Sequence, residues 1–485
     1  MDLYFSDVFE VTKESLDDYG AFNISLITDL PLFIDPFLLF CSQKDEYKRL
    51  HNSIVDYLGF LRDKSASQRI PDGLLHSWFY FPEVKQNWLG FTLKGNEGRG
   101  LGEVFARALN NNLPRISPSF GKEHSITRGT HLEKLCLISR GVGRDTISDF
   151  TTNLTKEYLL EYTQAFAERH ISANHTERVT VNGVRFDYAT ERWMSHTYTL
   201  PFYRNDYVIL TPKDILTKDD TWINRTDYLN GFPGIAMAVP DEQLREQLNN
   251  YLNQVLTERL RKRDYDAAIT RITIEHPELI DYYIRDREDR EEEAVATSSE
   301  RVADSKQLYV ERFGTLVQYL SDNTLFYTVK GNTATEARQR IEYLKDIIEN
   351  KGGWKAFYAD NQPIRREEDL HVFYRLTWFG TPSDVSHEVN DGRGPADFKV
   401  SRGSRDKTIV EFKLASNTHL QRNLENQVEA YQRASDADVG YKVVFCFTDA
   451  ELKKVQRIVE ELGLSQNHNI VLIDARKKIS ASQVI

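Results

Sequence analysis

The spacing of hydrophobic residues predicts a chain that mixes helices with strands. Apolar side chains recur every three or four positions over 148–170, 334–350 and 366–379, a spacing typical of amphipathic helices. Short apolar runs at 396–400 and 408–414 predict strands. We therefore expect a mixed α+β protein of the broad α/β class, whose large N-terminal region is mostly helical.

Two local signals predict a turn and a helix start in the first half of the chain. The dipeptide Asn182-Gly183 is typical of a type I′ turn, which predicts a β-hairpin over 179–186. Asp241 precedes a stripe that includes Leu244 and Leu248, so we expect Asp241 to cap a helix.

Charge divides the chain into a front and a back part. The protein has 62 basic and 73 acidic side chains and a net charge of −11, and the last 135 residues hold only 20 and 19 of them. The acidity therefore belongs to residues 1–350. We expect a recognition or regulatory region over 1–280, of one or two subdomains. A helical connector over 281–350 and a separate domain over 351–485 would follow it.

Composition excludes several classes of protein. The hydrophobic share of 40% and charged share of 28% are typical of soluble globular proteins. The acidic balance argues against a protein that coats nucleic acid non-specifically. No apolar run reaches the roughly 18–20 residues that span a bilayer. The three cysteines show no zinc-ligand spacing, and we expect a cytoplasmic protein in a reducing compartment.

Candidate chemistry lies in the hairpin that 396–400 and 408–414 would form. If residues 401–407 form its loop, Val400 pairs with Thr408, and Asp397 lies opposite Glu411. Glu411 and Lys413 then share one face of the strand. Two carboxylates directly opposite each other repel, and a divalent cation such as Mg²⁺ or Mn²⁺ relieves this repulsion.

At these residues the sequence resembles the PD-(D/E)xK nuclease superfamily, whose fold is that of restriction endonucleases. The matching stretches are Gly394-Pro395-Ala396-Asp397-Phe398 and Val410-Glu411-Phe412-Lys413-Leu414. The resemblance covers roughly 365–485, and it implies an αβββαβ domain that hydrolyses phosphodiester bonds with Mg²⁺ or Mn²⁺. It also implies that Asp397 and Glu411 bind the metal and that Lys413 is the catalytic lysine.

The same resemblance suggests further site residues. The family often carries another acidic residue on the helix before the hairpin, and Glu388 is the best match as a third metal ligand. Some branches carry a Gln-x-x-x-Tyr pair on the following helix, which Gln427 and Tyr431 match as supporting residues. Basic residues around the hairpin are candidates for contacts with a nucleic-acid backbone, with a solvated loop as the alternative: Arg393, Arg402, Arg405, Lys407 and Arg422.

The sequence therefore predicts a Mg²⁺-dependent endonuclease acting on DNA, with defence against foreign DNA as a role suggested by family association. Two alternatives stay open: a catalytically silent nucleic-acid-binding or assembly module, and a nuclease directed at RNA. A double-strand break needs two hydrolyses, so we expect a homo-oligomer or partner proteins. We expect no membrane partner.

Overall fold

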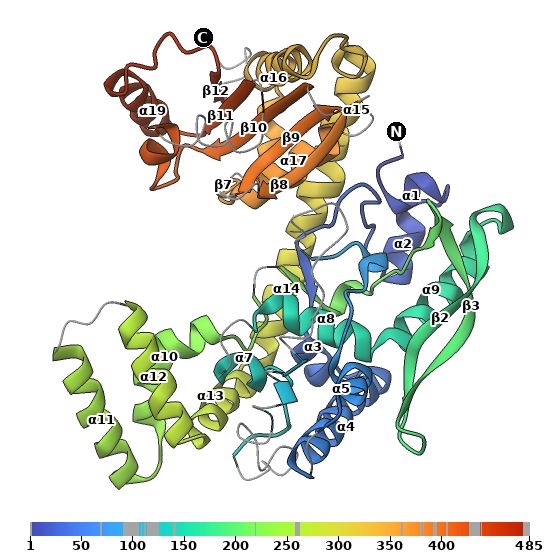
Figure 1. The fold of residues 1–485 in the computed structure, drawn as a ribbon, viewed down its shortest axis with the longest axis vertical. Helices are drawn as coiled ribbons and strands as arrows, with labels where there is room; N and C mark the ends of the chain where they lie inside the picture. Colours follow the sequence, from blue (N-terminus) through green and yellow to red (C-terminus); the bar gives the residue numbers. More distant parts are fainter. Residues whose placement is uncertain are drawn as a thin grey trace.

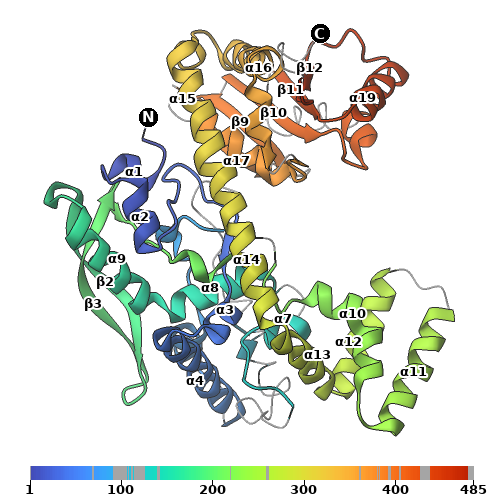
Figure 2. The same ribbon diagram turned by 180° about the vertical axis from the view of Figure 1, so that it is seen from behind.

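The protein is a mixed α+β chain in which a long helix joins two groups of elements (Figures 1 and 2). The computed structural model describes residues 2–67, 70–90, 106–107, 109–110, 113, 126–138, 142–218, 220–257, 262–359, 362–378, 381, 383–390, 395–403, 406–425, 437 and 439–478. Within this part of the chain, no helix is both long and apolar enough to cross a membrane.

The N-terminal group consists of short helices around a long β-hairpin. Its helices are α1 (Phe5–Val8), α2 (Lys13–Tyr19), α3 (Pro36–Cys41), α4 (Asp45–Ser67), α5 (Asp72–Phe79), α7 (Lys134–Ile138), α8 (Arg144–Leu154) and α9 (Lys156–His170). Its strands are β1 (Leu32–Ile34), β2 (Thr176–Asp187), β3 (Arg192–Tyr203), β4 (Asp206–Tyr207) and β5 (Leu216–Lys218). Helix α9 packs on the β2–β3 hairpin, and β1 pairs with β5.

Two predictions in this region were wrong in detail. The single helix expected over 148–170 is interrupted at Thr155, where α8 ends and α9 begins. Asn182-Gly183 is not the hairpin turn but lies inside β2, where Gly183 takes a φ of 63° and the pairing shifts in register. The turn forms instead after Asp187, because its carboxylate accepts the backbone N–H groups of Ala189 and Thr190.

Helices dominate the middle of the chain. They are α10 (Arg225–Ala238), α11 (Glu242–Thr257), α12 (Lys262–Glu275), α13 (Glu278–Asp289), α14 (Glu291–Ser305) and α15 (Phe313–Asn323). The predicted cap of α11 is confirmed, because the Asp241 carboxylate accepts the Leu244 N–H at 2.7 Å. A π-helical stretch over Lys306–Arg312 joins α14 to α15, and together they form the long helix that reaches the C-terminal sheet (Figure 2).

The C-terminal group is a five-stranded mixed sheet in the order β12-β11-β10-β9-β8. Its strands are β8 (Asp384–Asn390), β9 (Pro395–Arg402), β10 (Asp406–Leu414), β11 (Val439–Cys446) and β12 (Ile470–Asp474). The meander β8–β9–β10 is antiparallel, whereas β11 is parallel to β10 and β12 is parallel to β11. Helices α16 (Thr333–Asn350), α17 (Glu367–Trp378) and α19 (Asp449–Glu461) accompany it.

The two faces of this sheet are covered by different helices. Phe398 and Phe412 contact Tyr374 of α17, Phe445 packs against Phe412 on the same face, and α16 packs along the strands beside α17. On the other face, a second core joins Ala415, Leu420, Val444 and Cys446 to Val455 of α19. Helix α16 lies within the expected connector but packs on the sheet, so the C-terminal group begins there.

Candidate active site

The register of the β9–β10 hairpin brings Asp397 and Glu411 to neighbouring positions. Val400 pairs with Thr408 as the sequence predicts, and Phe398 pairs with Val410. Asp397 and Glu411 are the next residues along the two strands from the Phe398–Val410 pair. The ladder extends beyond the predicted strands to Arg402 and Asp406, so the connection is shorter than the expected loop over 401–407.

The hairpin strands β9 and β10 also pair with β8 and β11, so the alignment of charged positions continues across four strands. The pairs His387–Phe398 and Val389–Ala396 bracket the positions of Glu388 and Asp397. On the other side, Glu411 pairs directly with Lys442 of β11. Paired positions belong to the same face of a sheet. The row formed by positions 388, 397, 411 and 442, here called the charged row, therefore holds three acidic residues and one lysine.

The expectation that Glu388 lies on the helix before the hairpin is wrong. Glu388 belongs to strand β8, in which Val385, His387 and Val389 alternate with polar residues. That alternation has the period of a strand and not of a helix. The register nevertheless places Glu388 level with Asp397.

The helix before the hairpin contributes Glu367, which sequence reasoning missed. Glu367 is the first residue of α17, and its Oε2 lies 3.5 Å from Lys413 Nζ. Its Oε1 accepts a hydrogen bond of 2.8 Å from Asn417 Nδ2 and one of 3.4 Å from the Leu414 N–H. One carboxylate thus joins the start of α17 to the end of β10 and holds the Lys413 ammonium.

Two residues of the charged row and the neighbouring Lys413 are almost inaccessible to solvent. Glu411 is 2% exposed, Lys413 9% and Lys442 1%. Lys442 Nζ donates to the backbone carbonyl of Asn423. Loss of solvation lowers the pKa of Lys442 from 10.5 to about 8; the Lys413 charge acts in the same direction, and the Glu411 carboxylate opposes it. Two ammonium groups and a carboxylate are therefore buried close to one another.

The predicted nucleic-acid contacts fall in different places. Arg402 is bound to Glu336 of α16 and to Ser383, and it belongs to the face that α16 and α17 cover. Its guanidinium therefore serves the fold and is not placed beside the charged row, which corrects the expectation. Lys407 is half-buried on the same strand face as Glu411, and Arg422 is exposed on a helical turn.

The remaining candidates cannot be placed, because Arg393, Arg405, Gln427 and Tyr431 lie outside the described residues. Side chains at 388 and 397 also lie outside the description, which extends only to the backbone there.

The chemistry of the donors fits a hard divalent cation. Among the side chains that the structure describes, no group of three or more His, Cys, Asp or Glu is arranged to hold a metal ion. Glu411 and Glu367 supply carboxylate oxygens at the two ends of this site, and the backbone places Asp397 and Glu388 beside Glu411. Carboxylate oxygen is the donor type that Mg²⁺ and Mn²⁺ prefer.

Two stretches of the chain match models of protein families. Residues 10–224 match a domain of unknown function (DUF8370), and residues 333–449 match a second domain of unknown function (DUF8371). No curated protein and no solved structure matches the chain. The second match begins with α16 and contains Glu367 and the whole charged row. Neither description names an activity, so the chemistry of the site is the guide to function.

Proposed function

We propose that the chain is a metal-dependent nuclease that hydrolyses phosphodiester bonds of DNA, with its active site at the charged row. The observation that carries the proposal is the register that lines up Glu388, Asp397, Glu411 and Lys442 across four strands, with Lys413 on the same face as Glu411. Read from α17 to β11, with the helical residues 420–425 between β10 and β11, the order of elements is the αβββαβ that the resemblance to PD-(D/E)xK nucleases implies.

Each residue has a role that follows from its position. Asp397 and Glu411 would hold the metal, with Glu388 or Glu367 as a further oxygen donor. When bound, Mg²⁺ or Mn²⁺ would polarise the phosphodiester and lower the pKa of a water molecule. Lys413 would orient the attacking water or stabilise the negative charge that develops on the phosphate. The Glu367 carboxylate fixes the position of the Lys413 ammonium.

The burial of these charges supports a catalytic role over a structural one. Charged residues placed on a sheet only for solubility remain in water, whereas Glu411, Lys413 and Lys442 are buried. Buried charges of this kind are costly to the fold and are concentrated at functional sites. Defence against foreign DNA is the role that the family resemblance suggests, with residues 1–280 recognising the substrate or a partner.

A cleavage assay tests the proposal directly. The full chain is incubated with plasmid, linear duplex, single-stranded DNA and RNA, each with Mg²⁺, Mn²⁺ or EDTA. Asp397→Ala and Lys413→Ala are compared with Lys453→Ala, which removes an exposed lysine on α19. We expect metal-dependent cleavage of DNA that both site variants lose and the control keeps.

The assay also separates the alternatives. Cleavage of RNA alone would replace the DNA assignment with an RNA-directed nuclease. If no substrate is cut, Mn²⁺ binding is measured by titration calorimetry. Absence of metal binding in the wild type, together with intact nucleic-acid binding, would overturn the enzymatic proposal in favour of a silent binding module.

A further inference from the structure

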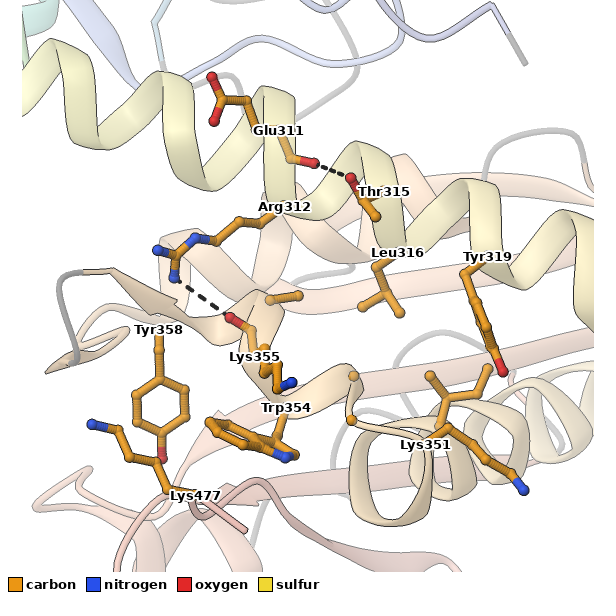
Figure 3. A pocket seen from close by; sticks show the side chains of 14 residues that line it. Glu311, Arg312, Thr315, Leu316, Tyr319, Lys351, Trp354, Lys355, Tyr358 and Lys477 are labelled. Carbon is orange, nitrogen blue, oxygen red and sulfur yellow. Dashed lines mark hydrogen bonds between the residues drawn. The ribbon is translucent and has the colours of Figure 1, made fainter. Parts of the chain in front are cut away.

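A second concave site lies on the C-terminal group, formed by residues outside the charged row. A pocket of about 640 Å³ opens between α15 with its π-helical start and the segment that follows α16 (Figure 3). That segment includes a 3₁₀ turn over Gly353–Phe357 and leads into β6 (Tyr358–Ala359). A volume of this size is ordinary for a small-molecule site.

The pocket concentrates positive charge in an acidic protein. Among the described residues that line it, Arg312, Lys351, Lys355 and Lys477 are basic and Glu311 is acidic. Figure 3 shows the Glu311 carboxylate pointing away from the other side chains drawn, and it lies 4.0 Å from Lys306. Four cations therefore surround one cavity in a chain whose net charge is −11. Such an arrangement attracts an anion.

Three of these cations, Arg312, Lys351 and Lys355, make few contacts with the rest of the fold. Within the residues that the structure describes, neither Lys351 nor Lys355 forms an ion pair with a carboxylate, and both are exposed. The Arg312 guanidinium makes one hydrogen bond of 3.4 Å, to the backbone carbonyl of Lys355.

Aromatic rings and aliphatic side chains supply the rest of the lining. Trp354 and Tyr358 meet edge to face, with ring centroids 5.5 Å apart. Lys355 Nζ lies 5.9 Å from the centre of the Trp354 ring, and Lys477 Nζ lies 5.3 Å from that of Tyr358. Leu316 and Ile347 add apolar surface. Half-exposed Trp354 beside several cations is the combination that binds a flat ring carrying a phosphate.

We propose that this pocket binds a nucleotide, with the base against Trp354 and the phosphate among Lys351, Lys355 and Lys477. The nucleotide could be free or could belong to a single strand of nucleic acid, because both present a base and a phosphate. An adjoining hollow shares Tyr358 and Lys477 and adds Arg476. Arg476 is already paired with Asp474 and Asp449, which favours a ligand of one nucleotide.

A packing contact connects the segment that forms the pocket to α17, the helix that carries Glu367. Phe357, in the 3₁₀ turn that contains Trp354, packs against Phe373 of α17 at 4.8 Å between ring centroids. The same helix begins at Glu367, which holds Lys413. Nucleotide binding can nevertheless be measured whether or not the chain is a nuclease, because the two sites share no lining residue.

The experiment measures binding to the full chain by titration calorimetry and by tryptophan fluorescence. The probes are ATP, AMP and GMP, a 5′-phosphorylated single-stranded octanucleotide, and inorganic phosphate as a competitor. Two variants alter the pocket: Trp354→Leu, and Lys351→Gln combined with Lys355→Gln. The matched control combines Lys48→Gln with Lys453→Gln, two exposed lysines away from the pocket. Circular dichroism checks that each variant is folded.

We expect saturable binding of at least one probe, weakened at least tenfold by each pocket variant and unchanged in the control. Tighter binding of a mononucleotide than of the octanucleotide identifies a free nucleotide as the ligand, and the reverse identifies a nucleic-acid strand. Absence of binding by every probe overturns the proposal. Binding that both folded pocket variants retain at wild-type strength overturns it as well.

Discussion

The carboxylate of Glu367 lies 3.5 Å from the ammonium nitrogen of Lys413, although 46 positions separate the two residues in the chain. The next two residues of α17 face the N-terminal group instead. Glu368 lies 3.4 Å from Arg144, and Asp369 lies 3.4 Å from Lys218. Three consecutive acidic residues of α17 thus contact both the candidate active site and the N-terminal group.

Replacing Glu367 with Gln tests whether its charge orients Lys413. The amide keeps an oxygen that can accept from Asn417 but loses the attraction to the ammonium. We expect metal-dependent cleavage to fall by about 10- to 100-fold, with little change in the free energy of unfolding. Cleavage rates and urea denaturation measure the two effects. Glu368→Gln is the matched control, because that side chain faces Arg144, and equal losses in both variants would contradict the assigned role.

Lys442 places a positive charge beside the proposed metal ligand Glu411, and its removal should favour a divalent cation. Replacement by Met keeps the length of the side chain and removes the charge. We expect Lys442→Met to bind Mn²⁺ about tenfold more tightly at neutral pH, because a neighbouring cation no longer repels the metal. Titration calorimetry measures the affinity, and Lys453→Met serves as control. Unchanged or weaker binding by a folded Lys442→Met protein would separate Lys442 from the metal site.

Local patterns in the sequence predicted the hairpin well. The apolar runs predicted both strands, and a loop over 401–407 predicted the pairing of Val400 with Thr408, which the structure shows. The predicted contact of Arg402 with nucleic acid was wrong. The alternation of side chains along β9 places Arg402 on the other face of the sheet from Glu411. The positive charge of Arg402 near the loop favours a contact with nucleic acid, but its position in the strand places it against α16.

The residues that sequence reasoning misplaced depend on contacts between distant elements. The family pattern predicts a helix at Glu388, whereas the alternation of residues around it is that of a strand. Glu367 is the first residue of a helix that the sequence predicts correctly. Three acidic residues begin this helix, as the positive end of the helix dipole favours. Only the packing of α17 against the end of β10 shows which of the three meets Lys413. The prediction of a turn at Asn182-Gly183 was wrong because the longer β2–β3 pairing outweighs the local preference of this dipeptide for a turn.

A buried ion pair within α16, on the side that faces the sheet, should be essential for stability. Glu336 and Arg340 are both fully buried and lie 3.2 Å apart, and Glu336 also accepts from Ser383 and binds Arg402. Glu336→Ala leaves the Arg340 guanidinium buried without this carboxylate. We expect the free energy of unfolding to fall by about 3–5 kcal/mol in urea denaturation.

The matched control for this pair is Glu342→Ala on the same helix, whose partner Arg338 is partly exposed. We expect a loss of less than about 1 kcal/mol there, because solvent screens the pair. The double variant Glu336→Ala, Arg340→Met should recover part of the loss. Equal stability of Glu336→Ala and Glu342→Ala would show that the buried pair contributes nothing.

Asp149 of α8 should make the stability of the protein depend on pH. Burial raises the pKa of its carboxyl from 3.8 to about 8, and the nearby charges of Glu83, Asp145 and Asp29 act in the same direction. The folded chain therefore keeps this proton at pH values where the unfolded chain has released it. The stability that the proton contributes is complete below pH 3.8 and is lost as pH rises toward 8.

Asp149→Asn has no proton to lose at this position. We expect the free energy of unfolding of Asp149→Asn, minus that of the wild type, to rise by about 2–4 kcal/mol between pH 4 and pH 8. Above pH 8 this difference should change little. Urea denaturation at several pH values measures the difference, with the exposed Asp63→Asn on α4 as control. A constant difference between Asp149→Asn and wild type over this range would mean that Asp149 is ionised in the folded protein at neutral pH. The ionised Asp149 would then repel Glu83, Asp145 and Asp29, and a bound cation or a movement of these side chains would have to offset that repulsion.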